Sequence, residues 1–296
     1  MKVLLTGYSG QLGKALIDSK PKNIGLICPS RKELDLADFD SCFNIVIKNK
    51  PDWIINAGAF TNVDQAEINR ELTLAVNSNC LVAFCKALKI TGGKLMQIST
   101  DYVFDGEEKK PYKVNQKKSP INFYGYSKAL AEDHILNFFG DQKKYLIIRT
   151  SWVLSATGNN FLKKIISLHA ENKKIRVISD QFGSITSTST LANACWKSIL
   201  YFSKDEYNHK RNSILHFTDQ GETSWYELAK VIGRIALDQG ILLKSAFVEP
   251  ITSNEYKSIA KRPKYSVLDC SQTYKDLNLK PINWITSIED IIKKIK

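Results

Sequence analysis

Short apolar runs alternate with amphipathic segments along the first half of this 296-residue chain. Runs that are apolar on both faces are typical of strands buried in a parallel sheet. Segments with apolar residues every three or four positions predict helices that pack on such a sheet. The alternation therefore predicts a doubly wound parallel α/β sheet. The expected strands cover residues 1–6, 24–28, 52–59, 94–98 and 145–152, and the expected helices a segment ending near residue 19 and residues 38–50, 71–90, 124–139 and 159–172.

The second half of the chain has a less regular pattern. The expected strands here are 175–179, 214–217 and 246–248, and the expected helices are 188–202, 222–240, 251–256 and 284–295. The strand at 214–217 can return to the main sheet. We expect a main domain of residues 1–151, with 187–218 returning to it. Residues 152–186 and 219–296 would form a smaller α/β lid over the carboxyl ends of the main strands.

A glycine-rich loop, Gly7-Tyr8-Ser9-Gly10-Gln11-Leu12-Gly13, joins the first strand to the first helix. Glycines at these positions allow a tight turn, a close backbone approach and close helix packing, and the helix N-terminus favours a pyrophosphate. This order of strand, loop and helix predicts dinucleotide binding, with a purely structural turn as the alternative. Small residues at another strand end, Asn56-Ala57-Gly58-Ala59, let a cofactor lie against the backbone.

The segment after the strand at 24–28 bears on the choice of cofactor. An NAD site usually places Asp or Glu at this strand end, to accept from the ribose 2′-hydroxyl. This chain has Ser30 and Arg31 there, which suit a 2′-phosphate. We therefore expect NADP(H) to be favoured, with NAD(H) possible; the alternative is that Arg31 is a plain surface charge. Leu34-Asp35-Leu36 is expected to form a short strand whose Asp35 meets the adenine.

Proton-transfer chemistry is indicated by Ser99-Thr100 at a strand end and by Tyr124 and Lys128 after it. Four-residue spacing on a helix projects Tyr124 and Lys128 from one face. A phenol has a pKa of about 10, and a nearby ammonium favours the phenolate, so we expect Lys128 to lower the pKa of Tyr124. A hydroxyl from Ser99 or Thr100 can bind the reacting oxygen. Taken alone the Tyr-x-x-x-Lys spacing also arises by chance, and only the glycine loop makes the catalytic interpretation specific.

Composition narrows the class of protein. Hydrophobic residues make up 43% of the chain and charged residues 24%, as in ordinary globular proteins. The net charge of +12 is spread along the chain, which favours solvated surface over nucleic-acid binding, with a basic groove for an anionic diphosphate as the functional alternative. We expect no membrane span, a cytoplasmic location, reduced cysteines and no metal site.

The motifs in this order resemble the extended short-chain dehydrogenase/reductase superfamily. Further strings narrow the resemblance to the dTDP-4-dehydrorhamnose reductase family; they cover residues 60–67, 99–104, 149–153, 158–161, 180–183, 223–225 and 261–263. The resemblance implies a Rossmann domain and reduction, dependent on NAD(P)H, of the C4 ketone of dTDP-4-dehydro-L-rhamnose to dTDP-L-rhamnose. It implies no metal, and a homodimer is possible.

The resemblance also assigns roles by position. Tyr124 would donate the proton to the C4 oxygen, Lys128 would hold the nicotinamide ribose, and Thr100 would bind the same oxygen with Asp101 beside it. Trp152 and Arg262 would contact the substrate, Arg262 at its diphosphate; the alternatives are a core tryptophan and a surface arginine. The cofactor would lie on Gly7, Gly10, Gln11, Leu12, Arg31, Asp35, Leu36, Ala57, Gly58, Ala59, Tyr124 and Lys128.

Some positions depart from the family pattern, namely Phe60, Leu154 and Ser184-Ile185-Thr186. They lie on the expected substrate side, so the sequence leaves the exact sugar open. One alternative is an epimerase or dehydratase of the same fold acting on another nucleotide sugar. Another is a non-catalytic binding module that resembles the regulatory subunit of methionine adenosyltransferase.

Overall fold

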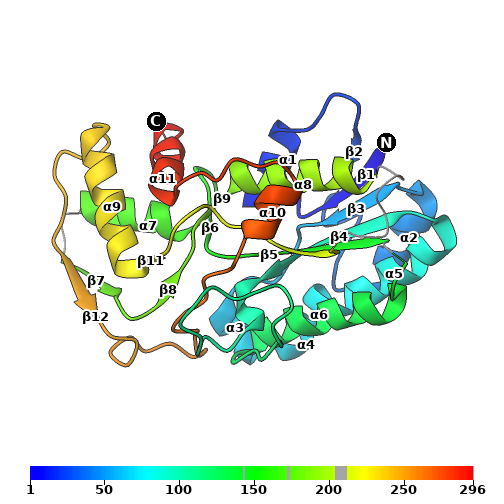
Figure 1. The fold of residues 1–296 in the computed structure, drawn as a ribbon, viewed down its shortest axis with the longest axis horizontal. Helices are drawn as coiled ribbons and strands as arrows, with labels where there is room; N and C mark the ends of the chain where they lie inside the picture. Colours follow the sequence, from blue (N-terminus) through cyan, green and yellow to red (C-terminus); the bar gives the residue numbers. More distant parts are fainter. Residues whose placement is uncertain (143, 172–173, 204–211, 296) are drawn as a thin grey trace.

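A computed structural model describes residues 1–142, 144–171, 174–203 and 212–295 of the chain. Its main feature is a six-stranded sheet in which every neighbouring pair is parallel, with strand order β10-β5-β4-β3-β1-β2. The predicted doubly wound parallel sheet is therefore confirmed (Figure 1). The strands are β1 Lys2–Thr6, β2 Gly25–Ile27, β3 Trp53–Asn56, β4 Lys94–Thr100, β5 Tyr145–Thr150 and β10 Ile214–His216.

Helices cover both faces of this sheet. On one face, α1 (Gln11–Asp18) and α8 (Thr188–Phe202) pack on the sheet through a core that includes Leu16 and Trp196. The other face is covered by α2 (Phe39–Asn49), α5 (Cys80–Thr91) and α6 (Phe123–Phe139), as Figure 1 shows. Strand order reverses around β1, since β2 and β3 flank it, so the crevice at the carboxyl ends of β1 and β3 is where a ligand is expected to bind.

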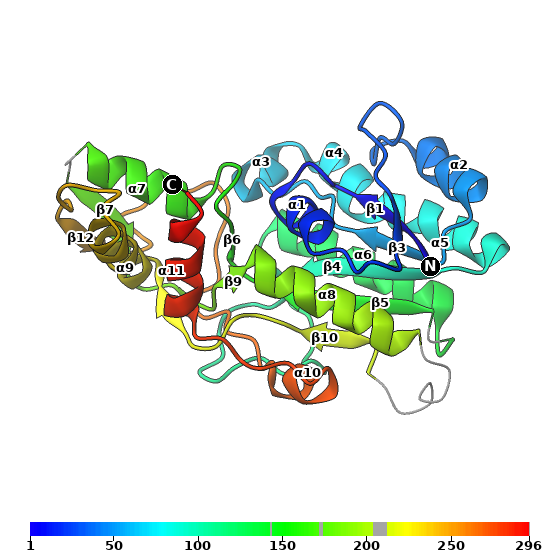
Figure 2. The same ribbon diagram turned by 90° about the horizontal axis from the view of Figure 1, so that it is seen from above.

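A second lobe has its own apolar core and lies beside the carboxyl ends of the main strands (Figure 2). The chain enters it after β5, returns to the main sheet through α8 and β10, and then leaves again. Residues 143, 172–173, 204–211 and 296 of the expected domain ranges lie outside the described residues. The elements of this lobe are β6 Val153–Leu154, α7 Phe161–Ala170, β7 Ile175–Ile178, β8 Phe182–Gly183, β9 Thr186–Ser187, β11 Thr223–Ser224, α9 Trp225–Asp238, β12 Val248–Ile251 and α11 Trp284–Lys293.

Two short elements differ from the prediction. The strand expected at Leu34-Asp35-Leu36 is wrong, because the Asp35 carboxylate accepts from the Ala37 backbone N–H at 3.0 Å and folds the segment into a turn. The helix expected at 251–256 is also wrong, because β12 continues to Ile251 in parallel with β7. Glu255 then accepts from the Thr252 N–H at 2.8 Å, which makes a turn after the strand.

The helix expected at 71–90 is interrupted. Helix α4 (Arg70–Leu74) is followed by a π-helical turn at Ala75–Asn79 and then by α5. Such a turn inserts one residue and changes the direction in which side chains leave the helix, and it is often found at functional sites. Within the described residues, every helix is too short or too polar to cross a membrane.

Candidate active site

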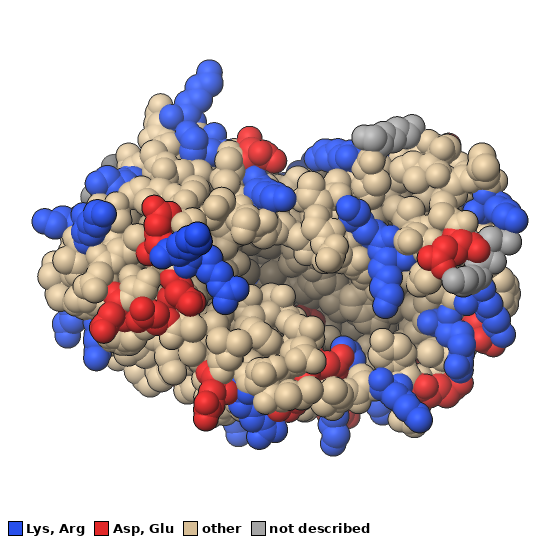
Figure 3. All heavy atoms as spheres, turned by 180° about the vertical axis from the view of Figure 1, so that it is seen from behind, with Lys and Arg blue, Asp and Glu red and all other residues tan. Residues whose placement is uncertain are grey.

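Three cavities of the described residues together contain most of the residues expected in the site. The central cavity, of about 420 Å³, lies between the two lobes, and Figure 3 shows a hollow there with Lys and Arg side chains at its rim. The edge cavity (about 390 Å³) lies over β1 and β2, and the lid cavity (about 260 Å³) lies in the second lobe. The central cavity is lined by Gln11, Leu12, Ala57, Gly58, Ala59, Thr100, Asp101, Tyr124, Lys128 and Trp152, and the edge cavity by Gly7, Arg31, Asp35, Leu36 and Ala59.

The glycine loop fits a dinucleotide. Gly7 has φ +65°, which L residues rarely adopt, and a Cβ there would lie 2.6 Å from the Gly58 nitrogen. The ends of β1 and β3 therefore touch and leave a flat backbone floor between the edge and central cavities. Gly10 lines neither cavity; it is the N-cap of α1 and has no side chain to occupy the free N–H groups of the first turn. An anionic pyrophosphate can accept from such groups.

Gln11, expected at the cofactor, also joins the two lobes. Its Oε1 accepts from Ser155 Oγ and from Asn160 Nδ2, both at 2.8 Å. Both partners belong to the second lobe, and Asn160 is at the same time the N-cap of α7. The glycine loop and the lid are thus held together at one edge of the central cavity.

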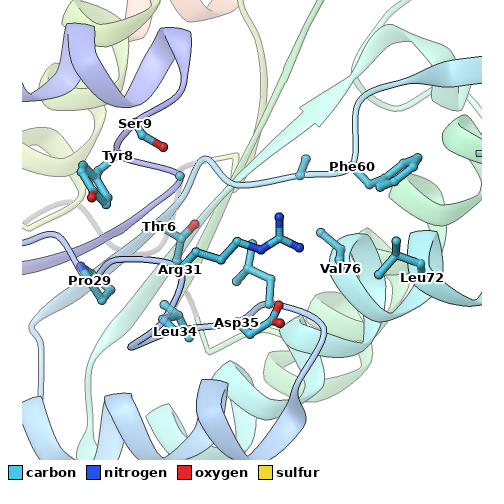
Figure 4. Close-up of a pocket in the computed structure, with 13 residues that line it drawn as sticks. Thr6, Tyr8, Ser9, Pro29, Arg31, Leu34, Asp35, Phe60, Leu72 and Val76 are labelled. Carbon is cyan, nitrogen blue, oxygen red and sulfur yellow. The ribbon is translucent and has the colours of Figure 1, made fainter. Parts of the chain in front are cut away.

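Arg31 extends its guanidinium across the edge cavity (Figure 4). The close-up places its tip between the Asp35 carboxylate and Val76. An arginine in this position can bind a 2′-phosphate through two parallel N–H groups. The Asp or Glu that an NAD site usually has at the end of β2 is not present here, because the strand is followed by Cys28, Pro29 and Ser30.

Tyr124 and Lys128 enter the central cavity from the first turns of α6. The helix begins there because the Asn122 side chain caps it, accepting from the Gly125 N–H at 2.8 Å. Lys128 is 3% exposed and donates from Nζ to the Ile98 carbonyl at the end of β4, at 2.7 Å. This contact fixes α6 against β4.

The structure distinguishes the two hydroxyls at the end of β4. Ser99 Oγ donates to Glu132 Oε1 at 2.5 Å, and the same buried carboxylate binds Arg149 through two contacts of 2.9 and 2.7 Å. The Ser99 hydroxyl is therefore committed to a buried ion pair. Thr100 lines the central cavity beside Tyr124, and its hydroxyl donates to Asp101 Oδ1 at 2.9 Å. Of the two hydroxyls it is therefore the one that is not bound to the buried ion pair.

The pKa of Tyr124 is shifted in the direction opposite to the one expected. Burial raises the pKa of Tyr124 to about 12, although the hydrogen bond from Thr100 lowers it. Burial also lowers the pKa of Lys128 to about 8. Lys128 points at the Ile98 carbonyl, which explains why it does not bring the phenol toward neutrality. Tyr124 is consequently protonated at neutral pH, the state that a proton donor requires.

Asp101 is a buried carboxyl group that lines the central cavity. Its Oδ1 accepts from Thr100 Oγ1 at 2.9 Å, whereas Oδ2 is buried without a hydrogen-bond partner. Burial raises the pKa of Asp101 to about 7. A buried group with a shifted pKa that lowers the stability of the folded protein and lines a cavity is a candidate for contact with a ligand.

Replacing Asp101 with Asn is expected to stabilise the protein at alkaline pH. In the unfolded chain this carboxyl has the ordinary aspartate pKa of 3.8, whereas in the folded protein its pKa is about 7, so the folded state binds the additional proton between these values. Stability therefore falls as the pH rises through this window, by an amount on the order of 4 kcal/mol. Because a buried amide retains part of the burial cost, we expect Asp101→Asn to raise the free energy of unfolding at pH 8 by about 1–2 kcal/mol.

Urea denaturation of both proteins at pH 4.5 and pH 8 measures this effect. The stability difference should be larger at pH 8 than at pH 4.5, and kcat/KM should be lower in the variant because the carboxyl group lines the central cavity. An equal difference at both pH values would show that the charge of Asp101 is not the cause.

Trp152 forms the lid side of the central cavity in a constrained conformation. Its φ is +40°, in the left-handed region that costs a bulky residue energy. Its ring stacks on Trp225, with ring centroids 3.6 Å apart, and a Cβ built at Gly183 would lie 2.7 Å from the indole. Trp225 lines both the central cavity and the lid cavity, so this pair separates the two.

Arg262 lies in the lid cavity and does not line the central one. One nitrogen, Nη2, donates to Asp64 Oδ2 at 3.0 Å. The other, Nη1, is buried and has no hydrogen-bond partner. The Arg262 side chain is 20% exposed. A buried N–H that lacks an acceptor is suited to an anionic ligand.

Asn77 was not among the residues expected in the site. It lies in the π-helical turn, and its side chain exchanges hydrogen bonds with the Phe60 backbone, accepting from N at 2.7 Å and donating to O at 3.1 Å. It also donates to Ser127 Oγ at 2.9 Å, and Ser127 donates to the Tyr124 carbonyl. Asn77 thus connects the loop after β3 to α6, the helix that carries Tyr124. In the sequence, the only indication of such a role was a polar residue within an apolar helical pattern.

Comparisons with known proteins agree with this geometry. The family model described as RmlD substrate binding domain matches residues 1–296. The chain is 32% identical over 295 residues to dTDP-4-dehydrorhamnose reductase from Aggregatibacter actinomycetemcomitans, covering 98% of each protein. It is 31% identical to dTDP-4-keto-6-deoxy-D-glucose reductase from Streptomyces niveus, covering 96% of this chain and 94% of that protein.

Solved structures show the same relationship. The crystal structure of dTDP-4-dehydrorhamnose reductase from Bacillus anthracis, in complex with NADP, superposes with a TM-score of 0.87 at 31% identity, covering 99% of each chain. The match therefore extends over both lobes and all three cavities. This chain belongs to the dTDP-4-dehydrorhamnose reductase family.

Proposed function

We propose that this protein reduces the C4 ketone of dTDP-4-dehydro-L-rhamnose to the alcohol of dTDP-L-rhamnose, with NADPH as the favoured cofactor. The observation that carries the proposal is the arrangement in the central cavity, where Tyr124, Thr100 and Lys128 meet at the end of a glycine-floored dinucleotide crevice. Membership of the reductase family supports the same reaction. The relative from Bacillus anthracis was solved with NADP, which supports the choice of cofactor.

Each residue of the central cavity has a separate role in the proposed ketone reduction. When bound, the reduced nicotinamide supplies the hydride. Tyr124 is protonated at neutral pH and supplies the proton to the ketone oxygen. Thr100 donates a hydrogen bond to that oxygen, and Lys128 offers its ammonium to the ribose hydroxyls of the cofactor. Trp152 and Trp225 exclude water from the lid side.

The lid cavity is suited to the nucleoside diphosphate of the substrate. It combines the cations Lys164, Arg176 and Arg262 with the aromatic rings of Phe161, Trp225 and Tyr256. Phosphate oxygens pair with such cations, and a pyrimidine stacks on such rings. Because Trp225 belongs to both cavities, a diphosphate held in the lid cavity would place its sugar in the central one.

The test is an assay of NAD(P)H oxidation with enzymatically prepared dTDP-4-dehydro-L-rhamnose, run with NADPH and with NADH. Stoichiometric consumption of cofactor supports a reductase, whereas an epimerase or dehydratase would consume none. A parallel assay with dTDP-4-keto-6-deoxy-D-glucose separates the two sugars named by the relatives. Absence of turnover with both sugars would overturn the proposal.

The choice of NADPH predicts the effect of removing Arg31. Replacing Arg31 with Ala is expected to raise the KM for NADPH about tenfold and to leave the KM for NADH unchanged, because only NADPH carries a 2′-phosphate. Lys32→Ala is the matched control, since Lys32 is the neighbouring cation and does not line the edge cavity. Equal losses with both cofactors would contradict the assignment of Arg31.

A cytoplasmic location and a homodimeric state belong to the same proposal. Cell fractionation and light scattering of the purified protein test them.

A further inference from the structure

Asp64 forms an unusual set of contacts between the two lobes. It lies in α3 (Val63–Ile68), which Asn62 caps by accepting from the Gln65 N–H at 3.1 Å. Its carboxylate accepts from the Ala260 backbone N–H at 3.0 Å through Oδ1 and from Arg262 Nη2 at 3.0 Å through Oδ2. One side chain of the main lobe therefore holds both the backbone and the cation of a lid segment almost 200 residues away.

The segment that carries Arg262, residues 252–262, contains no helix or strand. Asn122 Nδ2 donates to the Lys261 carbonyl at 2.9 Å, and near the other end of the segment Asp180 accepts from the Ser253 N–H at 2.8 Å. Ile259, within it, is 63% exposed. A long side chain on such a segment loses considerable entropy when it is held in one geometry, so an external acceptor is needed to hold the guanidinium in place.

The direction of the guanidinium gives this contact its functional meaning. Nη2 is bound to Asp64, whereas Nη1 is buried without a hydrogen-bond partner, and Arg262 lines the lid cavity together with Lys164 and Arg176. Arg262 also lies beside the Tyr102 phenol, whose pKa burial raises and the guanidinium lowers. A salt bridge that served only to join the lobes would not leave a buried N–H unused, because an unpaired buried donor destabilises the folded protein. An anion that accepts a hydrogen bond from Nη1 would satisfy this donor.

We propose that Asp64 is a positioning residue for substrate recognition, which orients Arg262 so that Nη1 faces the diphosphate of the bound nucleotide. The inference rests on the proposed function, since it assumes that the lid cavity holds a nucleoside diphosphate. Asp64 itself does not contact the nucleotide. It acts through Arg262 and preorganises the cavity before the substrate arrives.

Electrostatics alone predicts the opposite effect of removing the charge. A carboxylate close to an anion site repels the anion, so neutralising Asp64 would strengthen nucleotide binding if its role were only electrostatic. A positioning role predicts weaker binding, because Arg262 then loses its fixed geometry. The sign of the change therefore separates the two explanations.

The experiment measures dTDP binding to the full chain by calorimetry, for the wild type and for Asp64→Asn, Arg262→Gln and the double variant. Asp64→Asn keeps the oxygen that accepts from Ala260, so the segment is retained and only the pairing with Arg262 is weakened. We expect its Kd for dTDP to rise about tenfold while its Kd for NADPH is unchanged. The double variant should bind no more weakly than Arg262→Gln alone, because the two residues act as one unit.

Asp133→Asn is the matched control, since Asp133 pairs with Lys118 at 2.6 Å outside all three cavities. Unchanged or tighter dTDP binding in Asp64→Asn, or additive losses in the double variant, would overturn the inference while leaving the proposed function intact. A wild-type protein that binds no dTDP would overturn the proposed function and the inference together. Thermal unfolding of each variant confirms that the folded protein is being measured.

Discussion

Replacing Tyr124 with Phe is expected to lower kcat for ketone reduction about a thousandfold, within the range of roughly 10² to 10⁴ for the loss of a general acid. The phenol lines the central cavity beside Thr100 and can donate a proton to the ketone oxygen. Because the proton moves only as the reaction proceeds, its loss affects the transition state more than the ground state. The Kd for NADPH should stay within about twofold of the wild-type value.

Stopped-flow measurement of NADPH oxidation under single-turnover conditions tests this result, with fluorescence titration for cofactor affinity. The ring of Tyr124 packs edge-on against Tyr102 at 6.0 Å between centroids, and Phe preserves that contact. Tyr126→Phe on the same helix is the matched control, because Tyr126 is 47% exposed and lines none of the three cavities. Normal turnover in Tyr124→Phe would reject Tyr124 as the proton donor.

Short sequence patterns predicted the parts of the site whose residues lie close together in the sequence. Tyr124 and Lys128 lie four residues apart on one helix, so spacing alone brings them to one face. The glycine loop joins one strand to one helix, and the order of these elements indicates a crevice at the strand ends. These residues line the central and edge cavities of the structure, with Gly10 as the helix cap between them.

Contacts between distant segments lay beyond this kind of reasoning. Ser99 and Thr100 are adjacent and chemically alike, and only Glu132, in another element, determines which hydroxyl remains available. The raised pKa of Tyr124 follows from burial, which spacing does not reveal. The partner of Arg262 is equally hidden, because Asp64 lies on a short helix of the other lobe.

The same limit explains why Trp152 was open to two interpretations. A tryptophan after a buried strand fits a core position as well as a cavity wall, and the decision depends on what lies on each side of the ring. The structure brings both Trp225 and Gly183 against the ring, from two elements more than 30 residues apart along the chain. Gly183 therefore determines how far the indole can retreat from the central cavity.

Replacing Gly183 with Ala is accordingly expected to lower kcat/KM about a hundredfold. The new Cβ would lie 2.7–2.9 Å from three atoms of the Trp152 indole, closer than any real contact allows. The indole has little room to move back, since it is stacked on Trp225 and its backbone is held at φ +40°. It is displaced toward the central cavity, and a displacement of about 1 Å in a substrate-positioning group can cost a hundredfold in rate.

Steady-state kinetics and urea denaturation of Gly183→Ala measure the two consequences of this clash. Stability should fall by about 1–3 kcal/mol, the usual cost of overpacking. Gly25→Ala is the matched control, because a Cβ there meets its nearest atom at 4.0 Å. In a Trp152→Leu background the same Gly183→Ala change should cost little stability, since the smaller side chain leaves space for the methyl group. An undiminished cost in that background would show that the Gly183 position acts through something other than the indole.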